Sequence, residues 1–332
     1  MSSGKQLVDK FGRVHDKLRV SVTDTCDIRC YYCMPQAGRA FTPRAGLLSV
    51  EEIERIVRVG VNLGLRKIRL TGGEPLVRKD LNVLITRLMC IEGVESIALT
   101  TNGVLLADRA QELYDAGLRR INVHLDSMDR ETYKVITRRD AFDAVMHGLR
   151  VANDLGYGPI KINAVAVRGR SEYDIVALAK FGRKSGMQVR FIEFMPLDSQ
   201  GLWNINNVLS AEEMRAILKR EIGPLIPITS AEQGAPASEF RFADGSGSVG
   251  FIASVTKPFC GNCNRLRLTA DGKLRYCLFA VEETDLRPLL LSENNDAIES
   301  AMFDCVHAKW QGHTIGAPQF VPPPRSMSAI GG

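Results

Sequence analysis

The sequence of 332 residues has no apolar run that approaches the roughly 20 residues needed to cross a bilayer, which excludes a transmembrane protein. Its first dozen residues also lack the apolar core of a secretory signal. We therefore expect a cytoplasmic protein whose eight cysteines stay reduced and form no structural disulfides. Tandem repeats and low-complexity blocks are absent, and only residues 317–332 have the composition of a largely unstructured tail.

Aromatic residues are few. The two tryptophans and seven tyrosines do not alternate with basic clusters, as they would on a nucleic-acid-binding surface. Lys and Arg number 43 against 38 for Asp and Glu, a mild excess that suits an anionic small molecule as well as nucleic acid. With 45% hydrophobic and 24% charged residues, the composition is typical of a globular enzyme.

From residue 15 to about 195, short β-branched runs alternate with longer helical patterns, which is typical of a parallel α/β sheet. The patterns predict strands over 17–23, 67–73, 96–103, 120–127, 160–167 and 189–196, and helices over 49–64, 79–91, 104–116, 141–155 and 172–185. Six strands are too few for a closed eight-stranded barrel. The predicted fold class is therefore α/β, with an incomplete (βα)6 barrel of the triosephosphate isomerase type.

The rhythm breaks after residue 204, where a helix over 210–221 and short alternating runs over 248–256, 264–270 and 273–278 predict a C-terminal antiparallel β layer that closes the open side. We expect a flexible N-terminus over 1–14, the partial barrel over 15–200, a second region over 201–320 and a flexible tail over 321–332. Catalytic residues of such folds gather at the carboxyl ends of the strands. The residues at these ends are Cys26, Gly72, Asn102, Asp126 and Met195.

Six of the cysteines form two trios. Cys26, Cys30 and Cys33 have the spacing CxxxCxxC, and Cys260, Cys263 and Cys277 follow as CxxC and a third cysteine. Two CxxC pairs could make a four-thiolate zinc site, but this alternative leaves one cysteine of each trio unexplained. A cubane iron–sulfur cluster is usually held by four thiolates, so three leave one iron with an open position. The other two, Cys90 and Cys305, lie in predicted helices and are interpreted as small buried thiols.

The first trio, with the aromatic Tyr32 before its last cysteine, resembles the radical S-adenosylmethionine (SAM) superfamily, in which SAM chelates the open iron. "TGGEP" (71–75) resembles the glycine-rich motif of that superfamily, whose exposed backbone approaches the SAM amino group. The chemistry implied is cleavage of SAM by one electron from the cluster. The resulting 5′-deoxyadenosyl radical abstracts a hydrogen from an unreactive carbon.

Together with "FCGNCNRLRLTADGKLRYC" (259–277), these motifs resemble the molybdenum cofactor biosynthesis protein A family, the GTP 3′,8-cyclases, from about Arg19 to the end. The resemblance implies a rearrangement of GTP to (8S)-3′,8-cyclo-7,8-dihydroguanosine 5′-triphosphate, the first step of molybdopterin synthesis. It also implies two [4Fe-4S] clusters, each held by one trio, with SAM at the first and GTP at the second. The implied SAM contacts are Tyr32, Gly73, His124 and Met195, and the implied GTP contacts are Arg19, Arg69, Thr100, Lys161, Arg265, Leu266 and Arg267.

Period-two spacing independently places Arg265 and Arg267 on one face of a strand, beside the second trio. Guanidiniums that point into a barrel are costly unless an anion meets them, and a triphosphate suits arginine forks. Arg190 belongs to the same pattern. Further candidates for the site are Gly72, Glu74, Asn102, Gly331 and Gly332.

Position 124 departs from the family, which usually has Ser in "VSLD" where this chain has "VHLD". We hypothesise that His124 hydrogen-bonds SAM; the alternative is a residue that only orients its neighbours. The family also suggests that the terminal Gly331 and Gly332 reach the active site, where small residues fit a narrow cavity.

Two other functions remain possible from the sequence. One is a peptide-modifying radical SAM enzyme with an auxiliary cluster, and the other is a zinc-stabilised nucleic-acid-binding protein. The cyclase interpretation predicts GTP as substrate, an unidentified electron donor and the next enzyme of the pathway as partners, no membrane or nucleic acid, and a homodimer as a family expectation.

Overall fold

The computed structural model describes residues 5–35, 40–198, 201–229 and 234–331. Within these ranges the strands form one mixed sheet in the order β12-β11-β10-β1-β2-β3-β4-β5-β6-β9-β8-β7. The six central strands are parallel to one another. They are β1 (Lys17–Ser21), β2 (Lys67–Thr71), β3 (Ser96–Thr101), β4 (Arg120–His124), β5 (Lys161–Ala166) and β6 (Gln188–Glu193).

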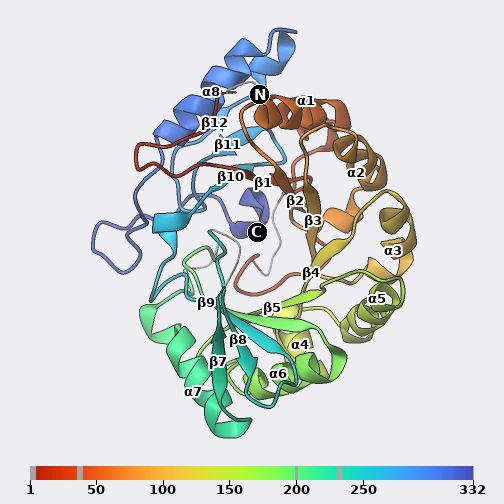
Figure 1. The fold of residues 1–332 in the computed structure, drawn as a ribbon, viewed down its shortest axis with the longest axis vertical. Coiled ribbons are helices and arrows are strands. Elements are labelled where there is room, and N and C mark those ends of the chain that lie inside the picture. Colours follow the sequence, from red (N-terminus) through yellow and green to blue (C-terminus); the bar gives the residue numbers. More distant parts are fainter. Residues whose placement is uncertain (1–4, 36–39, 199–200, 230–233, 332) are drawn as a thin grey trace.

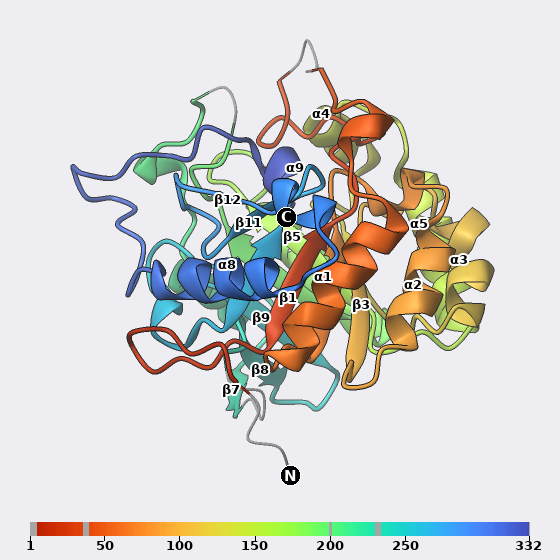
Figure 2. The ribbon, with the colours of Figure 1, turned by 90° about the horizontal axis from the view of Figure 1, so that it is seen from above.

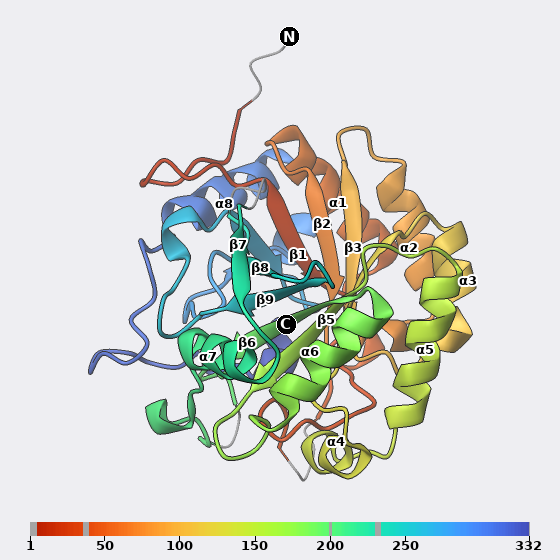
Figure 3. The ribbon, with the colours of Figure 1, turned by 60° about the horizontal axis from the view of Figure 1, so that its bottom comes forward.

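The helices that connect these strands cover the outside of the curved sheet (Figures 1 and 3). They are α1 (Val50–Asn62), α2 (Leu81–Met89), α3 (Leu106–Asp115), α4 (Arg130–Thr137), α5 (Phe142–Asp154) and α6 (Asp174–Ser185). Short 3-10 turns occur at Arg44–Gly46 (η1) and Pro75–Val77 (η2). The predicted helix and strand positions are confirmed with shorter ends, and α4 is an element that the sequence did not predict.

Helix α1 illustrates why these segments fold locally as they do. Ser49 accepts a hydrogen bond from the backbone N–H of Glu52, and the Glu52 side chain accepts one from the backbone of Ser49, which makes a capping box. Ile53, Ile56 and Val57 then form a fully buried stripe at helical spacing. Helix α1 therefore begins directly after its N-cap residue Ser49, and its apolar face packs into the hydrophobic core.

The C-terminal part of the chain extends the barrel sheet at both of its edges. β9 (Ser248–Ile252) pairs with β6 in parallel and is followed outward by the antiparallel β8 (Ser238–Phe242) and β7 (Leu225–Ile228). β10 (Arg265–Leu268) pairs with β1 in parallel, and β11 (Lys273–Arg275) and β12 (Thr284–Asp285) continue antiparallel. The incomplete barrel with added antiparallel strands is confirmed. The added strands are continuous with the barrel sheet because they satisfy the open backbone groups of its edge strands.

The remaining elements surround these additions. They are η3 (Ile205–Asn207), α7 (Ala211–Glu221), η4 (Cys260–Asn262), η5 (Pro288–Leu291), α8 (Asp296–His307) and α9 (Met327–Ile330). Helix α8 lies beside α1 in Figure 2. No described helix has the length and apolar character of a membrane span.

The sequence predicts flexible segments over 1–14 and 321–332, and the described parts of these segments, 5–14 and 321–331, contain buried residues. Leu7 is completely buried, and Val8 forms an antiparallel bridge with Val14. At the other end, α9 contains the buried Ile330, and Figure 1 marks the C-terminus near the middle of the ring of strands. Each end is held by contacts with distant parts of the chain, which local composition does not reveal.

Candidate functional site

The first cysteine trio lies in the loop after β1 and lines a cavity of about 200 Å³ at the carboxyl ends of the strands. Burial raises the pKa of Cys26 to about 12 and raises that of Cys30 well above its ordinary value. Three thiols on one cavity wall, Cys30 buried and the other two partly buried, are a donor set that suits an iron–sulfur cluster, whose irons stabilise thiolates. The predicted SAM residues Tyr32, Gly73, His124 and Met195 line the same cavity, as do Gly72 and Asn102.

The two glycines of the TGGEP motif allow a close approach between backbones. The backbone N–H of Gly73 donates to Thr23 O at 2.7 Å, and a Cβ at Gly73 would lie 2.3 Å from Thr25 O. A Cβ at Gly72 would lie 2.5 Å from Thr23 O. Any larger residue would therefore displace the strand end that leads directly into Cys26.

Glu74 is buried behind this loop and does not line the cavity. Its carboxylate accepts hydrogen bonds from Leu76 N (2.9 Å), Thr101 Oγ1 (2.7 Å) and Asn102 N (2.6 Å). Burial raises the pKa of Glu74 to about 7, although these donors act in the opposite direction. Glu74 therefore joins the TGGEP loop to the end of β3, and Asn102 in turn donates to Asp27 Oδ1 at 2.6 Å.

Tyr32, His124 and Asp126 form a compact hydrogen-bonded group. The Tyr32 hydroxyl lies 2.5 Å from both His124 Nε2 and Asp126 Oδ2, and the last two atoms are 2.9 Å apart. Burial lowers the pKa of His124, but the Asp126 carboxylate outweighs this effect and the net shift is upward. His124 thus contacts both the aromatic residue of the thiol motif and a buried carboxylate.

The second trio comprises Cys260 at the start of η4, Cys263 directly after η4 and Cys277 two residues after the end of β11. Burial raises the pKa of Cys263, but the positive charges of Arg265 and Lys309 outweigh it and lower this pKa to about 6. The Cys277 sulfur accepts from the backbone N–H of Phe279 at 3.5 Å. The surroundings of Cys263 thus stabilise its thiolate form, which suits a cluster ligand, whereas burial raises the pKa of Cys260.

Among the described residues, no three Cys, His, Asp or Glu side chains surround a point where one metal ion could sit. The zinc alternative required Cys30, Cys33, Cys260 and Cys263 to converge, but the first pair lines the cavity of the first trio and the second pair does not. Of the other two cysteines, Cys305 is buried as expected, whereas Cys90 is exposed at the end of α2, because its position on the helix faces solvent.

A basic cavity of about 220 Å³ lies inside the ring of strands. Its lining includes the predicted residues Arg19, Arg69, Thr100, Lys161, Arg190, Arg265 and Arg267. Strand register explains the clustering, because Arg19 stands directly between Arg267 and Arg69 on neighbouring strands. Cross-strand neighbours project from the same face of a sheet.

The cations of this cavity destabilise one another. Burial and the neighbouring Arg267 lower the pKa of Arg19 well below its ordinary value, and burial and Arg265 lower that of Arg267 to about 10. Burial and Arg190 likewise lower the pKa of Lys161. A polyanion would relieve this repulsion and replace the lost hydration.

One predicted GTP contact differs from the expectation, and one further residue of the cavity was not predicted. The Leu266 side chain is completely buried in the hydrophobic core, because it alternates with the two arginines of β10 and so faces away from the cavity. Only its backbone can approach a ligand. Arg120 lines the cavity although the sequence analysis did not name it. Its period-two relation to Asn122 and His124 was the signal that could have identified it.

The tail reaches the same region. Arg267 Nη1 donates to Gly331 O at 2.5 Å. A Cβ at Gly331, whose φ is +90°, would lie 2.8 Å from both Ser21 Cβ and Thr71 Oγ1. Glycine is thus required here by conformation and by space. Gly332 lies outside the described residues.

The two cavities share a wall formed by Thr100, Asn163, Ile192, Met195 and Met327. A ligand in the thiol-lined cavity therefore lies next to one in the basic cavity.

Comparison with known proteins agrees with this arrangement. Residues 20–182 match the model of the radical SAM superfamily, and residues 187–315 match that named Molybdenum Cofactor Synthesis C. A GTP 3′,8-cyclase of Rhodopirellula baltica is 48% identical over 98% of this chain and 92% of its own length. One of Thermodesulfovibrio yellowstonii is 44% identical over 98% of this chain and 100% of its own.

The chain belongs to the GTP 3′,8-cyclase family of radical SAM enzymes. Among solved structures, Streptococcus suis SuiB bound to its precursor peptide has a TM-score of 0.63 at 13% identity, covering 93% of this chain and 70% of that chain. The structure of anSMEcpe with bound AdoMet has a TM-score of 0.55 at 14% identity, covering 86% and 80%. These two likenesses concern the fold alone.

Proposed function

We propose that this protein is a GTP 3′,8-cyclase, which rearranges GTP to (8S)-3′,8-cyclo-7,8-dihydroguanosine 5′-triphosphate in the first step of molybdopterin synthesis. The observation that carries the proposal is the shared wall between a cavity lined by three thiols and a cavity lined by arginines. The family membership supports the same substrate.

Cys26, Cys30 and Cys33 would hold one [4Fe-4S] cluster, and Cys260, Cys263 and Cys277 a second. When bound, the first cluster and SAM would supply the 5′-deoxyadenosyl radical for abstraction of the C3′ hydrogen of GTP, and closure of the C3′–C8 bond would need one further electron and one proton to give the product. The residues assigned to SAM are Tyr32, Gly73, His124 and Met195, with Gly72 and Asn102 in the same cavity wall. Glu74 acts indirectly, because it fixes the loop that carries the two glycines.

The basic residues bind and orient the nucleotide. Arg19, Arg69, Lys161, Arg265 and Arg267, with the addition of Arg190, present several cations to a ligand that carries about four negative charges. Thr100 would contact GTP from the shared wall, and Leu266 by its backbone only. The contribution of these side chains is positioning and electrostatic stabilisation, since hydrogen abstraction by a radical needs no general base.

The C-terminal tail helps to exclude water. Met327 belongs to the shared wall, and Gly331 contacts Arg267. Gly331 and Gly332 are therefore assigned to the closure of the nucleotide site. A closed, dry site protects a carbon radical from side reactions.

The test uses anaerobically reconstituted protein with dithionite, SAM and each nucleoside triphosphate in turn. The expected result is conversion of GTP alone, with 5′-deoxyadenosine formed alongside. Cleavage of SAM with no nucleotide consumed would refute the substrate assignment and favour a peptide substrate. A colourless, oxygen-stable protein with bound zinc would refute the radical mechanism itself.

The proposal has consequences for the surroundings of the enzyme. It requires an electron donor and a following enzyme that accepts the cyclised nucleotide, and it needs no membrane or nucleic acid. Clusters with an open iron favour a reducing, cytoplasmic location. The proposal also includes a division of the chain near residue 200 into a SAM-binding part and a second-cluster part. It further includes a homodimer.

A further inference from the structure

Residues 7–15 form a tight turn against the segments that carry the second cysteine trio. Asp9 N donates to Arg13 O at 3.1 Å, and the Asp9 carboxylate accepts from the backbone N–H groups of Phe11 and Arg13 at 2.9 and 3.0 Å. His15 closes the turn through Nδ1, which lies 3.0 Å from Arg13 O. The turn fixes the direction of the Arg13 side chain.

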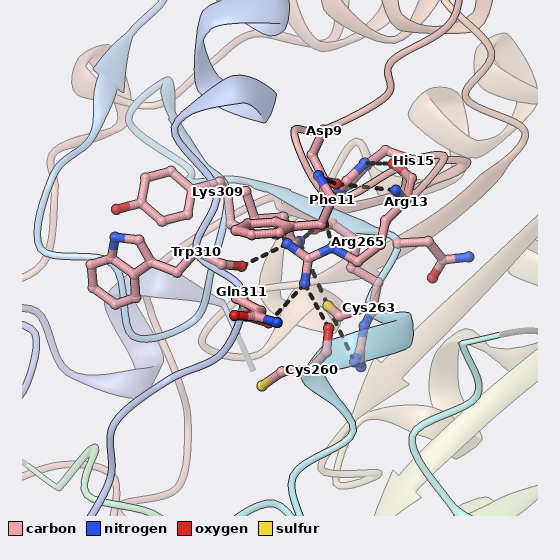
Figure 4. Close-up of polar contacts among 12 residues, drawn as sticks. Asp9, Phe11, Arg13, His15, Cys260, Cys263, Arg265, Lys309, Trp310 and Gln311 are labelled. Carbon is pink, nitrogen blue, oxygen red and sulfur yellow. Dashed lines mark hydrogen bonds and ion pairs between the residues drawn. The ribbon is translucent and has the colours of Figure 1, made fainter. Parts of the chain in front are cut away.

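The Arg13 guanidinium is buried and joins four partners (Figure 4). Nε donates to Asp9 Oδ2 at 2.5 Å. Nη1 donates to Cys260 O at 2.7 Å and to Gln311 O at 3.0 Å, and Nη2 donates to Trp310 O at 2.6 Å. One side chain from the N-terminal turn thus ties the first cysteine of the second trio to the segment after α8.

Lys309, the residue before this segment, holds the other two cysteines. Its side chain is buried, and Nζ lies 2.9 Å from Arg265 O, 2.9 Å from Tyr276 O and 3.6 Å from Cys263 Sγ. Arg265 O lies two residues after Cys263, and Tyr276 immediately precedes Cys277. An ammonium has three N–H donors, which equals the number of these acceptors.

Together, Arg13 and Lys309 fix all three chain segments that carry the cysteines of the second trio. Cys260 is tied through Arg13, and Cys263 and Cys277 are tied through Lys309. Trp310 and Gln311, whose carbonyls accept from Arg13, directly follow Lys309 in sequence, so both sets of hydrogen bonds depend on the segment 309–311. Hydrogen bonds of this kind around metal ligands raise metal affinity by fixing the orientation of the ligands.

We propose that Arg13 and Lys309 are positioning residues of the second cluster. They hold its three thiol-bearing segments in the arrangement that captures iron, and Lys309 adds a positive charge and an N–H···S contact at Cys263. The inference rests on the proposed function, since it concerns the cluster assigned there to Cys260, Cys263 and Cys277.

The experiment separates the two clusters by using two backgrounds. In one, the first trio is replaced by alanine, so that only the second cluster can assemble; in the other, the second trio is replaced. Each background is expected to bind about four iron atoms per chain after anaerobic reconstitution, measured by iron and sulfide analysis. If the background that retains Cys260, Cys263 and Cys277 binds no cluster, the proposed function fails before the inference is reached.

Arg13→Gln and Lys309→Met are then introduced into both backgrounds. Where only the second cluster assembles, we expect iron to be lost to a chelator about ten-fold faster than from the parent. Where only the first cluster assembles, the loss should equal that of its parent. Arg13→Lys and Lys309→Arg, which keep the charge and some of the donors, should restore part of the retention.

Arg109→Gln is the matched control. Arg109 also donates Nε to a carboxylate, that of Glu112 at 2.5 Å, and it donates to the backbone carbonyls of Leu76, Arg78 and Lys79. These three carbonyls belong to a segment that contains no cysteine of either trio. Its loss should lower the urea midpoint to a degree similar to Arg13→Gln and leave iron retention by the second cluster unchanged.

The reduction potential of the second cluster provides a readout that a purely structural role would not change. The positive charge of Lys309 and its contact with the Cys263 sulfur stabilise the reduced form of the cluster. Lys309→Met removes both and should therefore shift the reduction potential to a more negative value, and Lys309→Arg should shift it less. If Arg13→Gln and Lys309→Met both retain iron as well as the parent background does, and the reduction potential is unchanged, the inference is overturned while the proposed function stays intact.

Discussion

Glu193 is the residue at which a single substitution tests how the two halves of the chain are joined. It ends β6 and is completely buried. Oε1 accepts from Ala211 N at 2.9 Å and Thr256 Oγ1 at 2.5 Å, and Oε2 accepts from Val255 N and Thr256 N, both at 2.8 Å. One carboxylate therefore connects the barrel with the start of α7 and with the segment after β9.

The structure sets the relative cost of two substitutions. Glu193→Ala leaves three backbone N–H groups and the Thr256 hydroxyl without their acceptor, at about 1 kcal/mol each for donors in half-buried or exposed residues, or about 4 kcal/mol in total. Glu193→Gln keeps one oxygen. If its amide nitrogen occupies the Oε1 position, the Thr256 hydroxyl can rotate to accept, and only Ala211 N loses its acceptor. We expect a loss of about 1 kcal/mol for this variant.

The assay is urea unfolding of the anaerobic, reconstituted protein followed by far-UV circular dichroism, with slopes compared to confirm that midpoints report stability. Thr256→Val serves as the control that removes only the hydroxyl bond, at about 1 kcal/mol. Equal destabilisation by Glu193→Ala and Glu193→Gln, or a change below about 0.5 kcal/mol for both, would contradict the counting of donors.

Three further predictions concern the site and its closure. His124→Ser should weaken SAM binding and alter its pH dependence, because it removes the partner of Asp126; equilibrium binding between pH 6 and 9 that matches the parent would exclude His124 from the SAM site. Deletion of 331–332 should lower turnover far more than the urea midpoint, and full activity of the truncated protein would exclude a role for the double glycine. The pKa of Asp271 is about 2, because hydrogen bonds from Arg325 outweigh the opposing effect of burial. This pair should contribute about 2 kcal/mol above pH 3.8, a contribution that is lost as the pH falls toward 2. Urea midpoints of Arg325→Gln and the parent, measured on cluster-free protein, should therefore converge in acid, and a constant difference would contradict the assignment.

The central barrel and most of the site could be predicted from local patterns. Apolar spacing placed the six parallel strands and their helices, and thiol spacing identified both trios. Period-two alternation identified Arg265 and Arg267, and the structure places them in the basic cavity. The same alternation places the Leu266 side chain on the opposite face, so that only its backbone can contact a ligand in the cavity. Such features are encoded within a few residues, at periods that a strand or helix dictates.

Only the tertiary structure decided how the C-terminal strands join both barrel edges and how the ends of the chain are held. Arg13 and Cys260, whose contact stabilises the second trio, are 247 residues apart in sequence. Arg13 and Lys309 donate mainly to backbone carbonyls, which every residue has, so their partners leave no mark in the amino-acid pattern. The sequence by itself therefore determined which thiols and cations the site contains, and long-range backbone contacts decided how they are brought together.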